Sequence, residues 1–165
     1  MSPAIIFICG VSGSGKTTIG QQAAREIDLP FFDADDFHPA ANKEKMAAGI
    51  PLTDEDRMPW LQALNQLAGE CLEQAGAVIA CSALKQSYRD KLAQGITAPL
   101  YWVWLYGEQG LIEKRMRQRS AHFMPASLLA SQLSIAEPPF HAIHINISQP
   151  VQEITASVVR YVTGG

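Results

Sequence analysis

Apolar residues occur along the chain in five short runs that are separated by helical patterns. The runs cover residues 4–9, a stretch that ends at 31–32, and residues 77–81, 99–106 and 142–147. After the first run, Ile19, Ala23 and Ile27 recur every four positions, which indicates an amphipathic helix. Buried strands that alternate with helices are typical of a parallel sheet covered on both faces. The pattern therefore predicts a doubly wound α/β domain with a five-stranded parallel sheet.

The polar segments directly after the apolar runs are the first candidates for a functional site. In doubly wound sheets, ligands bind beyond the carboxyl ends of the strands. The segments that reach this edge are residues 10–17, 33–38, 82–89, those from 107 onward, and 148–150.

Length and composition predict one domain that spans residues 1–165 and carries no strong charge. Hydrophobic residues make up 47% of the chain and charged residues 18%, as in ordinary globular proteins. The formal net charge of −3 gives no attraction to polyanions, so we expect neither a nucleic-acid nor a membrane partner. Cys9, Cys71 and Cys81 form no CxxC pair, and no signal peptide is visible, which predicts reduced thiols in a cytoplasmic protein.

The segment GVSGSGKTT, residues 10–18, follows the first apolar run and satisfies the pattern G-x-x-x-x-G-K-[ST]. Its glycines allow backbone N–H groups to converge on a phosphate at a helix N-terminus. Lys16 adds a positive charge at the β- and γ-phosphates, and the Thr17 hydroxyl is placed for Mg²⁺. The sequence thus predicts a P-loop for ATP and Mg²⁺. The expected nucleotide-binding residues are Gly10, Val11, Ser12, Gly13, Ser14, Gly15, Lys16, Thr17 and Thr18.

The rest of the chain argues against a GTP switch protein. There is no DxxG segment, and NKEK at residues 42–45 lacks the aspartate of a guanine-reading NKxD motif. A nucleotide-binding regulator without phosphoryl transfer stays open as an alternative, although it would not need acceptor groups at the strand ends.

The second strand leads into FFDADDFHP, which presents Asp33, Asp35, Asp36 and His38 beside the phosphate loop. Asp33 and Asp35 lie two residues apart and so point to the same side of an extended chain. One can hold the water shell of Mg²⁺ while the other takes an acceptor hydroxyl. The alternative is that Asp35 or Asp36 only caps the next helix.

Cationic residues follow in two further segments. Arg57 lies at a helix start in PLTDEDRMPW, where Thr53 or Asp56 is a plausible N-cap. Lys85 and Arg89 are four residues apart and therefore share one helix face, either toward the site or as a solvated surface pair.

A third cationic segment, IEKRMRQRSAHF, has cations spaced as expected at the base of a lid that closes over the site. Arg115 and Arg119 are four residues apart, and His122 follows three residues later. A lid arginine that reaches the transferring phosphoryl group can contribute about 10³ to 10⁵ in rate.

Together these segments resemble the P-loop gluconate kinases of the thermoresistant gluconokinase type, which are related to shikimate and nucleoside monophosphate kinases. The resemblance covers nearly the whole chain. It runs through GVSGSGKTT, DADDFHP, NKEKMAAGIPLTDEDRMPWL, CSALKQSYRDKL, RSAHFMP and LLASQL. It implies a P-loop NTPase fold with a lid and ATP-dependent, Mg²⁺-dependent phosphorylation of the 6-hydroxyl of D-gluconate, usually by a homodimer.

The resemblance also implies roles for individual residues. Asp33 would bind Mg²⁺ through water, Asp35 the acceptor hydroxyl and Arg57 the substrate carboxylate. A helical segment at about 38–75 would bind substrate, and residues at about 115–139 would form the lid. The catalytic set is then Lys16, Asp35, Arg115 and Arg119, and the substrate-binding set is Asp35, His38, Arg57, Lys85, Arg89 and His122. A kinase of another small hydroxy acid, such as shikimate, is the alternative in the same class.

Overall fold

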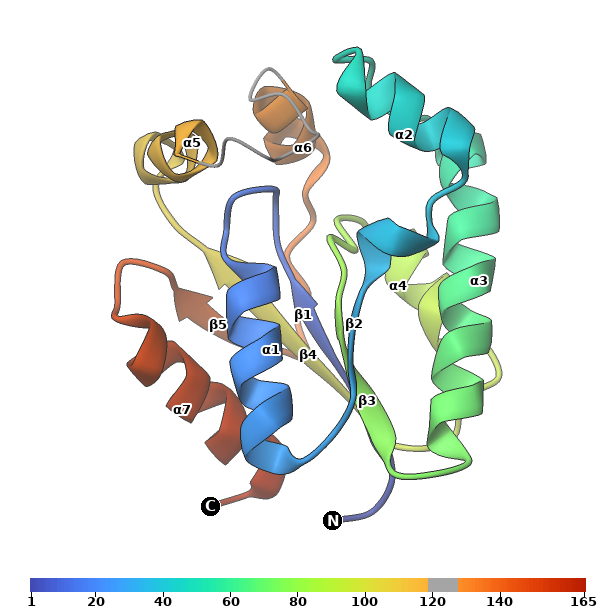
Figure 1. Cartoon of the computed structure of the whole chain (residues 1–165), viewed down its shortest axis with the longest axis vertical. Coiled ribbons are helices and arrows are strands. Elements are labelled where there is room, and N and C mark those ends of the chain that lie inside the picture. Colours follow the sequence, from blue (N-terminus) through green and yellow to red (C-terminus); the bar gives the residue numbers. More distant parts are fainter. Residues whose placement is uncertain (119–127) are drawn as a thin grey trace.

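A five-stranded parallel sheet forms the centre of the computed structural model, which describes residues 1–118 and 128–165 (Figure 1). The strands run in the order β2-β3-β1-β4-β5, and every neighbouring pair is parallel. The predicted doubly wound sheet is thereby confirmed. Its strands are β1 (Ala4–Cys9), β2 (Phe31–Asp33), β3 (Gly76–Ala80), β4 (Leu100–Tyr106) and β5 (Ile143–Asn146).

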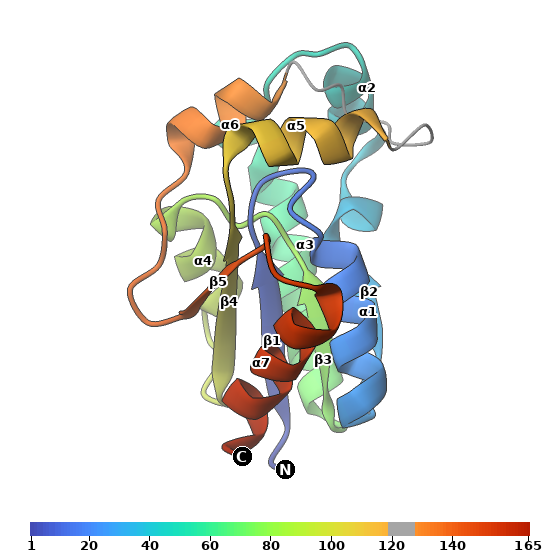
Figure 2. The same cartoon turned by 90° about the vertical axis from the view of Figure 1, so that its left-hand side faces the viewer.

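Helices cover both faces of this sheet and also its upper edge (Figures 1 and 2). Two of them, α1 (Lys16–Ile27) and α7 (Val151–Thr163), pack together over one face, while α3 (Asp54–Leu72) and α4 (Gln86–Ala93) pack together over the other. Above the carboxyl ends of the strands lie α2 (Ala40–Ala47), α5 (Gln109–Arg117) and α6 (Leu129–Ile135), and the 3₁₀ helix η1 (Ala34–Phe37) directly follows β2. Within the described ranges, no helix is both long and apolar enough to cross a bilayer.

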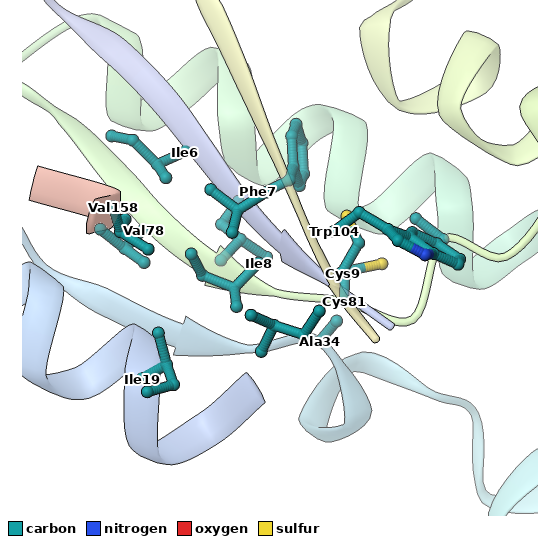
Figure 3. Packing of buried hydrophobic residues seen from close by; sticks show 14 of the residues in the cluster. Ile6, Phe7, Ile8, Cys9, Ile19, Ala34, Val78, Cys81, Trp104 and Val158 are labelled. Carbon is teal, nitrogen blue, oxygen red and sulfur yellow. The ribbon is translucent and has the colours of Figure 1, made fainter. Parts of the chain in front are cut away.

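The central strand β1 is buried along its whole length and carries the phosphate loop at its end. Figure 3 shows Ile6 and Ile8 on the side of Ile19 and Val158, which belong to α1 and α7, whereas Phe7 points to the opposite side. This alternation follows from the two-residue period of a strand. Each fully buried aliphatic or aromatic side chain contributes about 1.5–3 kcal/mol, so β1 is a firm base for the loop.

The start of α3 is fixed by a reciprocal capping box. The Thr53 hydroxyl accepts a hydrogen bond from the Asp56 N–H at 3.0 Å, and Asp56 Oδ2 accepts one from the Thr53 N–H at 2.9 Å. Both residues that the sequence offered as N-cap therefore belong to one motif, with Thr53 as the cap. Lys45 of α2 also binds Asp56 Oδ2 at 2.7 Å, and this bond, together with the capping bonds, lowers the pKa of Asp56 to about 2. The box places Arg57 in the first turn.

Candidate active site

The phosphate loop adopts a conformation that only glycine can supply at two positions. Gly10 has a φ of +147°, and a Cβ there would lie 2.8 Å from the carbonyl oxygen of Leu105. Gly13 has a φ of +82°, and a Cβ there would lie 2.6 Å from Cγ of Met116 in α5. Both values fall where L side chains are strained. Helix α5 thus covers the loop closely.

The backbone donors of the loop fit a bound phosphate group. In the described part of the chain, the N–H groups of Gly13, Gly15 and Lys16 have no hydrogen-bond acceptor. The Lys16 ammonium folds back over the loop and donates to the carbonyl oxygen of Val11 at 3.0 Å. Burial lowers the pKa of Lys16, and the nearby carboxylates of Asp35 and Asp33 oppose that effect. Free N–H groups at a helix N-terminus beside an ammonium form an anion site.

Thr17 and Asp33 meet at the start of α1 and the end of β2. Thr17 Oγ1 donates to Asp33 Oδ2 at 3.1 Å, while Asp33 Oδ1 accepts the Asp35 N–H at 3.0 Å and so caps η1. The next α-helix, α2, has Pro39 at its N-cap and no side-chain cap, so neither Asp35 nor Asp36 caps it. Mg²⁺ keeps several waters and needs only one or two protein oxygens beside nucleotide phosphates, which Thr17 and Asp33 fit. No group of three or more His, Cys, Asp or Glu residues is arranged to hold a metal within residues 1–118 and 128–165.

A cavity of about 200 Å³ opens between the phosphate loop, η1 and the start of α3. It brings together residues that the sequence proposed for different tasks: nucleotide binding, metal binding and acceptor binding. Lys85, Arg89 and Arg115 are not part of its lining. The predicted residues that line it are Ser12, Gly13, Gly15, Lys16, Thr17, Asp33, Asp35, His38 and Arg57.

Arg57 is held by the chain on one side and open on the other. Its Nη1 donates to the carbonyl oxygen of Leu52 at 2.7 Å and to the hydroxyl of Tyr88 at 3.0 Å, and its Cζ lies 5.2 Å from the centre of the Tyr88 ring. The Tyr88 hydroxyl in turn donates to Asp54 Oδ1 at 2.5 Å. Nη2 of Arg57 has no hydrogen-bond partner among the described residues. A fixed guanidinium with a free edge on the cavity is suited to a carboxylate.

Lys85 and Arg89 are engaged elsewhere in this structure. Lys85 is the N-cap of α4, and its ammonium lies 3.2 Å from Asp54 Oδ1. Arg89 is only 2% exposed, and its guanidinium donates to the carbonyl oxygens of Ala83 at 2.7 Å and Glu137 at 2.6 Å. These bonds tie the segment after α6 to the loop between β3 and α4. Direct substrate contacts by Lys85 and Arg89 remain a prediction from the sequence.

The predicted lid residues are only partly described. Arg115 of α5 donates to the carbonyl oxygen of Ile147 at 2.9 Å, and its Nη1 lies 4.0 Å from the position that a Cβ of Gly15 would occupy. It therefore lies beside the phosphate loop, and its action on the transferring phosphoryl group stays a prediction. Arg119 and His122 lie outside the described residues.

Several residues that shape the site were not singled out in the sequence. The His38 ring stacks on Trp60 with 4.2 Å between ring centres, and Asn42 contacts the same ring. Gln132 of α6 accepts a hydrogen bond from the Ser12 N–H at 2.7 Å and so joins α6 to the phosphate loop. The spacing of four between His38 and Asn42, and a polar glutamine within LLASQL, are the signals that could have identified Asn42 and Gln132.

Comparison with known proteins adds independent information. Residues 5–139 match the family model described as an AAA domain. A Dictyostelium discoideum protein named probable gluconokinase is 45% identical, over 95% of this chain and 85% of that protein. The thermoresistant gluconokinase of Escherichia coli (strain K12) is 38% identical, over 98% of this chain and 94% of that protein. The crystal structure of a gluconokinase from Sinorhizobium meliloti 1021 superposes with a TM-score of 0.87 at 40% identity, covering 99% of this chain and 93% of that one.

Proposed function

Since the chain belongs to the gluconokinase family, we propose that it transfers the terminal phosphoryl group of ATP to the 6-hydroxyl of D-gluconate. The products are 6-phospho-D-gluconate and ADP, and the proton of the hydroxyl is released. The bond between the γ-phosphorus and the bridging oxygen breaks as the bond to the acceptor oxygen forms. The chain is accordingly an ATP-dependent sugar-acid kinase.

The main support for this proposal is that residues of the phosphate loop and Arg57 line one and the same cavity. Gluconate has a carboxylate at one end and the reacting hydroxyl at the other, so it needs a cation at a distance from the phosphate site. Arg57 offers a free guanidinium edge, while Lys16 and Asp35 lie on the loop side of the same cavity. A substrate without a carboxylate would leave Arg57 unused.

The proposed roles follow from these positions. Lys16 and the loop N–H groups bind the phosphates, while Thr17 and, through water, Asp33 hold Mg²⁺. The ion neutralises charge on the phosphate oxygens when it is bound. Asp35 accepts a hydrogen bond from the 6-hydroxyl and orients it, because phosphoryl transfer depends on positioning more than on a strong base. Arg57 binds the carboxylate.

Further features of the family resemblance are part of the same proposal. Arg115 and Arg119 act on the transferring phosphoryl group, His122 closes over the substrate with the lid at about 115–139, and the helical segment at about 38–75 holds the acid. We propose a homodimer, which light scattering tests, and a cytoplasmic location, which is supported by the free thiols of Cys9, Cys71 and Cys81.

The proposal is tested by measuring ADP release with Mg·ATP across a panel of acceptors: gluconate, other aldonic acids, shikimate, glucose and nucleoside monophosphates. We expect selective turnover of gluconate. Turnover of shikimate or another acid in its place would keep the kinase and reassign the acceptor. ATP binding without turnover of any acceptor would instead favour a nucleotide-binding regulator.

A further inference from the structure

The imidazole of His38 is held in one plane beside the acceptor cavity. His38 follows η1 directly, is 8% exposed and lines the cavity. Its ring lies 4.2 Å from the Trp60 ring, with only 12° between the two planes. Trp60 is itself fixed, because its indole N–H donates to the carbonyl oxygen of Ala34 at 2.7 Å. The ring of His38 therefore has little freedom to turn.

Asn42 determines which nitrogen of that ring carries the proton. Asn42 Nδ2 lies 2.8 Å from the carbonyl oxygen of Asp56 and 3.2 Å from Nδ1 of His38. A backbone carbonyl can only accept, so the atom that faces Asp56 is the amide nitrogen and not the amide oxygen. The second N–H of the same amide then points at His38 Nδ1. That nitrogen must be the acceptor, and the single proton of the neutral ring is on Nε2.

We propose that Asn42 fixes His38 as the Nε2–H tautomer, so that His38 donates a hydrogen bond to a hydroxyl oxygen along the polyol chain of the substrate. The inference rests on the proposed function. Asp35 Oδ1 lies 4.0 Å from His38 Nε2, and within the described residues Nε2 makes no hydrogen bond. A donor and an acceptor thus lie next to each other on the cavity wall. Asp35 receives the reacting hydroxyl, and His38 selects substrates with a further hydroxyl oxygen beside it.

The surroundings keep His38 neutral over the physiological range. The charged groups around the ring are Asp35 on η1, Lys43 on α2 and Arg57 on α3. Burial, together with the smaller effect of the positive charges of Arg57 and Lys43, lowers the pKa of His38 to about 4. A second proton on Nδ1 would also face the N–H of Asn42. The donor character of Nε2 is therefore constant near neutral pH, and Asn42 is a positioning residue.

The variant Asn42→Asp reverses this arrangement with almost no change in size. A carboxylate beside Nδ1 stabilises a proton there, so the neutral ring keeps its lone pair on Nε2 and cannot donate to the substrate. At lower pH the ring takes up a second proton and both nitrogens donate again. We expect a KM for gluconate near the wild-type value at about pH 6 and raised about tenfold at about pH 9, the effect of one lost hydrogen bond. The KM for ATP should not change.

Asn65→Asp is the matched control. Asn65 also donates through Nδ2 to two carbonyl oxygens, those of Leu92 at 2.8 Å and Gln94 at 2.9 Å, but it does not line the cavity. Its substitution should leave the KM for gluconate unchanged at both pH values. An Asn42→Asp enzyme whose KM for gluconate is unchanged, or is raised equally at both pH values, would overturn the role of the tautomer.

Nitrogen-15 NMR of the imidazole in the wild-type protein tests the tautomer without any turnover. We expect Nε2 to be protonated and Nδ1 to be unprotonated across the neutral range. A proton on Nδ1 would refute the inference even if gluconate is the substrate. Conversely, the protein could show a protonated Nε2 and still fail to phosphorylate gluconate. The missing turnover would then reject the proposed function and the substrate contact, while the effect of Asn42 on the ring would be retained.

Discussion

Replacing Arg89 with methionine tests whether this cation stabilises the fold or binds the substrate. Arg89 is 2% exposed, and its guanidinium donates to the carbonyl oxygens of Ala83 and Glu137 and to the side chain of Gln86. In the described part of the chain, no carboxylate lies within 4.0 Å of it. Methionine keeps much of the aliphatic volume beside Trp104 but removes every donor.

The size of the effect follows from these bonds. Each buried carbonyl oxygen that loses its donor costs about 1–3 kcal/mol. The Ala83 carbonyl is buried, whereas the bond to the Glu137 carbonyl is only partly buried and its loss costs less. Because the charged guanidinium also no longer has to be desolvated, we expect a net loss of about 2 kcal/mol in the free energy of unfolding. For a domain of this size, that lowers Tm by about 4–8 °C.

Urea unfolding followed by circular dichroism measures this loss, and steady-state kinetics measures the KM for gluconate. We expect a lower urea midpoint with an unchanged m-value and a KM for gluconate within about threefold of the wild type. Lys91→Met is the control, because Lys91 is exposed on the same helix and its loss should change stability by less than about 0.5 kcal/mol. Unchanged stability of Arg89→Met together with a large rise in the KM for gluconate would refute a structural role for Arg89. It would instead indicate that Arg89 binds the carboxylate of the substrate.

Three further predictions concern the cavity. Arg57→Ala should raise the KM for gluconate about 10- to 100-fold and leave the KM for ATP nearly unchanged, since it removes a charged hydrogen bond to the carboxylate. A raised KM for ATP with an unchanged KM for gluconate would show that Arg57 does not bind the carboxylate. Lys16→Ala should lower kcat by at least about a thousandfold while the circular dichroism spectrum is retained, and an active variant would contradict the assigned role of the loop. The pKa of His38 is about 4 in the folded protein, below its ordinary value of 6.5, so the unfolded chain binds more protons between these values. The free energy of unfolding should therefore fall as the pH is lowered from about 6.5 to about 4. The urea midpoint of His38→Gln should fall less over this range than that of the wild type. Equal falls in the two proteins would disprove the lowered pKa of His38.

The sheet and the phosphate loop could be predicted from the sequence because local rules determine them. The apolar run at residues 4–9 coincides with β1, since a buried parallel strand is apolar on both faces. The run at 142–147 contains the edge strand β5 (Ile143–Asn146), in which His144 is exposed. The positive φ of Gly10 and Gly13 belongs to the loop itself, so the motif alone indicates these glycines. Their close approach to Leu105 and Met116 is a second reason, which only the folded chain shows.

The acceptor side could be predicted only in part, because it depends on contacts between distant residues. Arg57 and Arg89 are both cations near helix starts. Arg89 is buried outside the lining of the cavity, and one of the bonds that hold it there is to the carbonyl oxygen of Glu137, 48 residues further along the chain. The proton position on His38 likewise depends on the carbonyl oxygen of Asp56, which lies 14 residues beyond Asn42. Neither the burial of Arg89 nor the proton position on His38 can be predicted from spacing along the sequence.

The strand order has a consequence for how the protein acquires its active conformation during synthesis. The strand that carries the phosphate loop, β1, pairs with β3 and β4 and not with β2, its neighbour in sequence. The chain must therefore reach Tyr106 before β1 has both partners, although the loop is complete by Thr18. Pairing between such distant segments is slow, because the entropy of loop closure is lost before the contacts form. A nascent chain that ends before β4 exposes the apolar edge of β1, and this is the stage at which aggregation competes with folding.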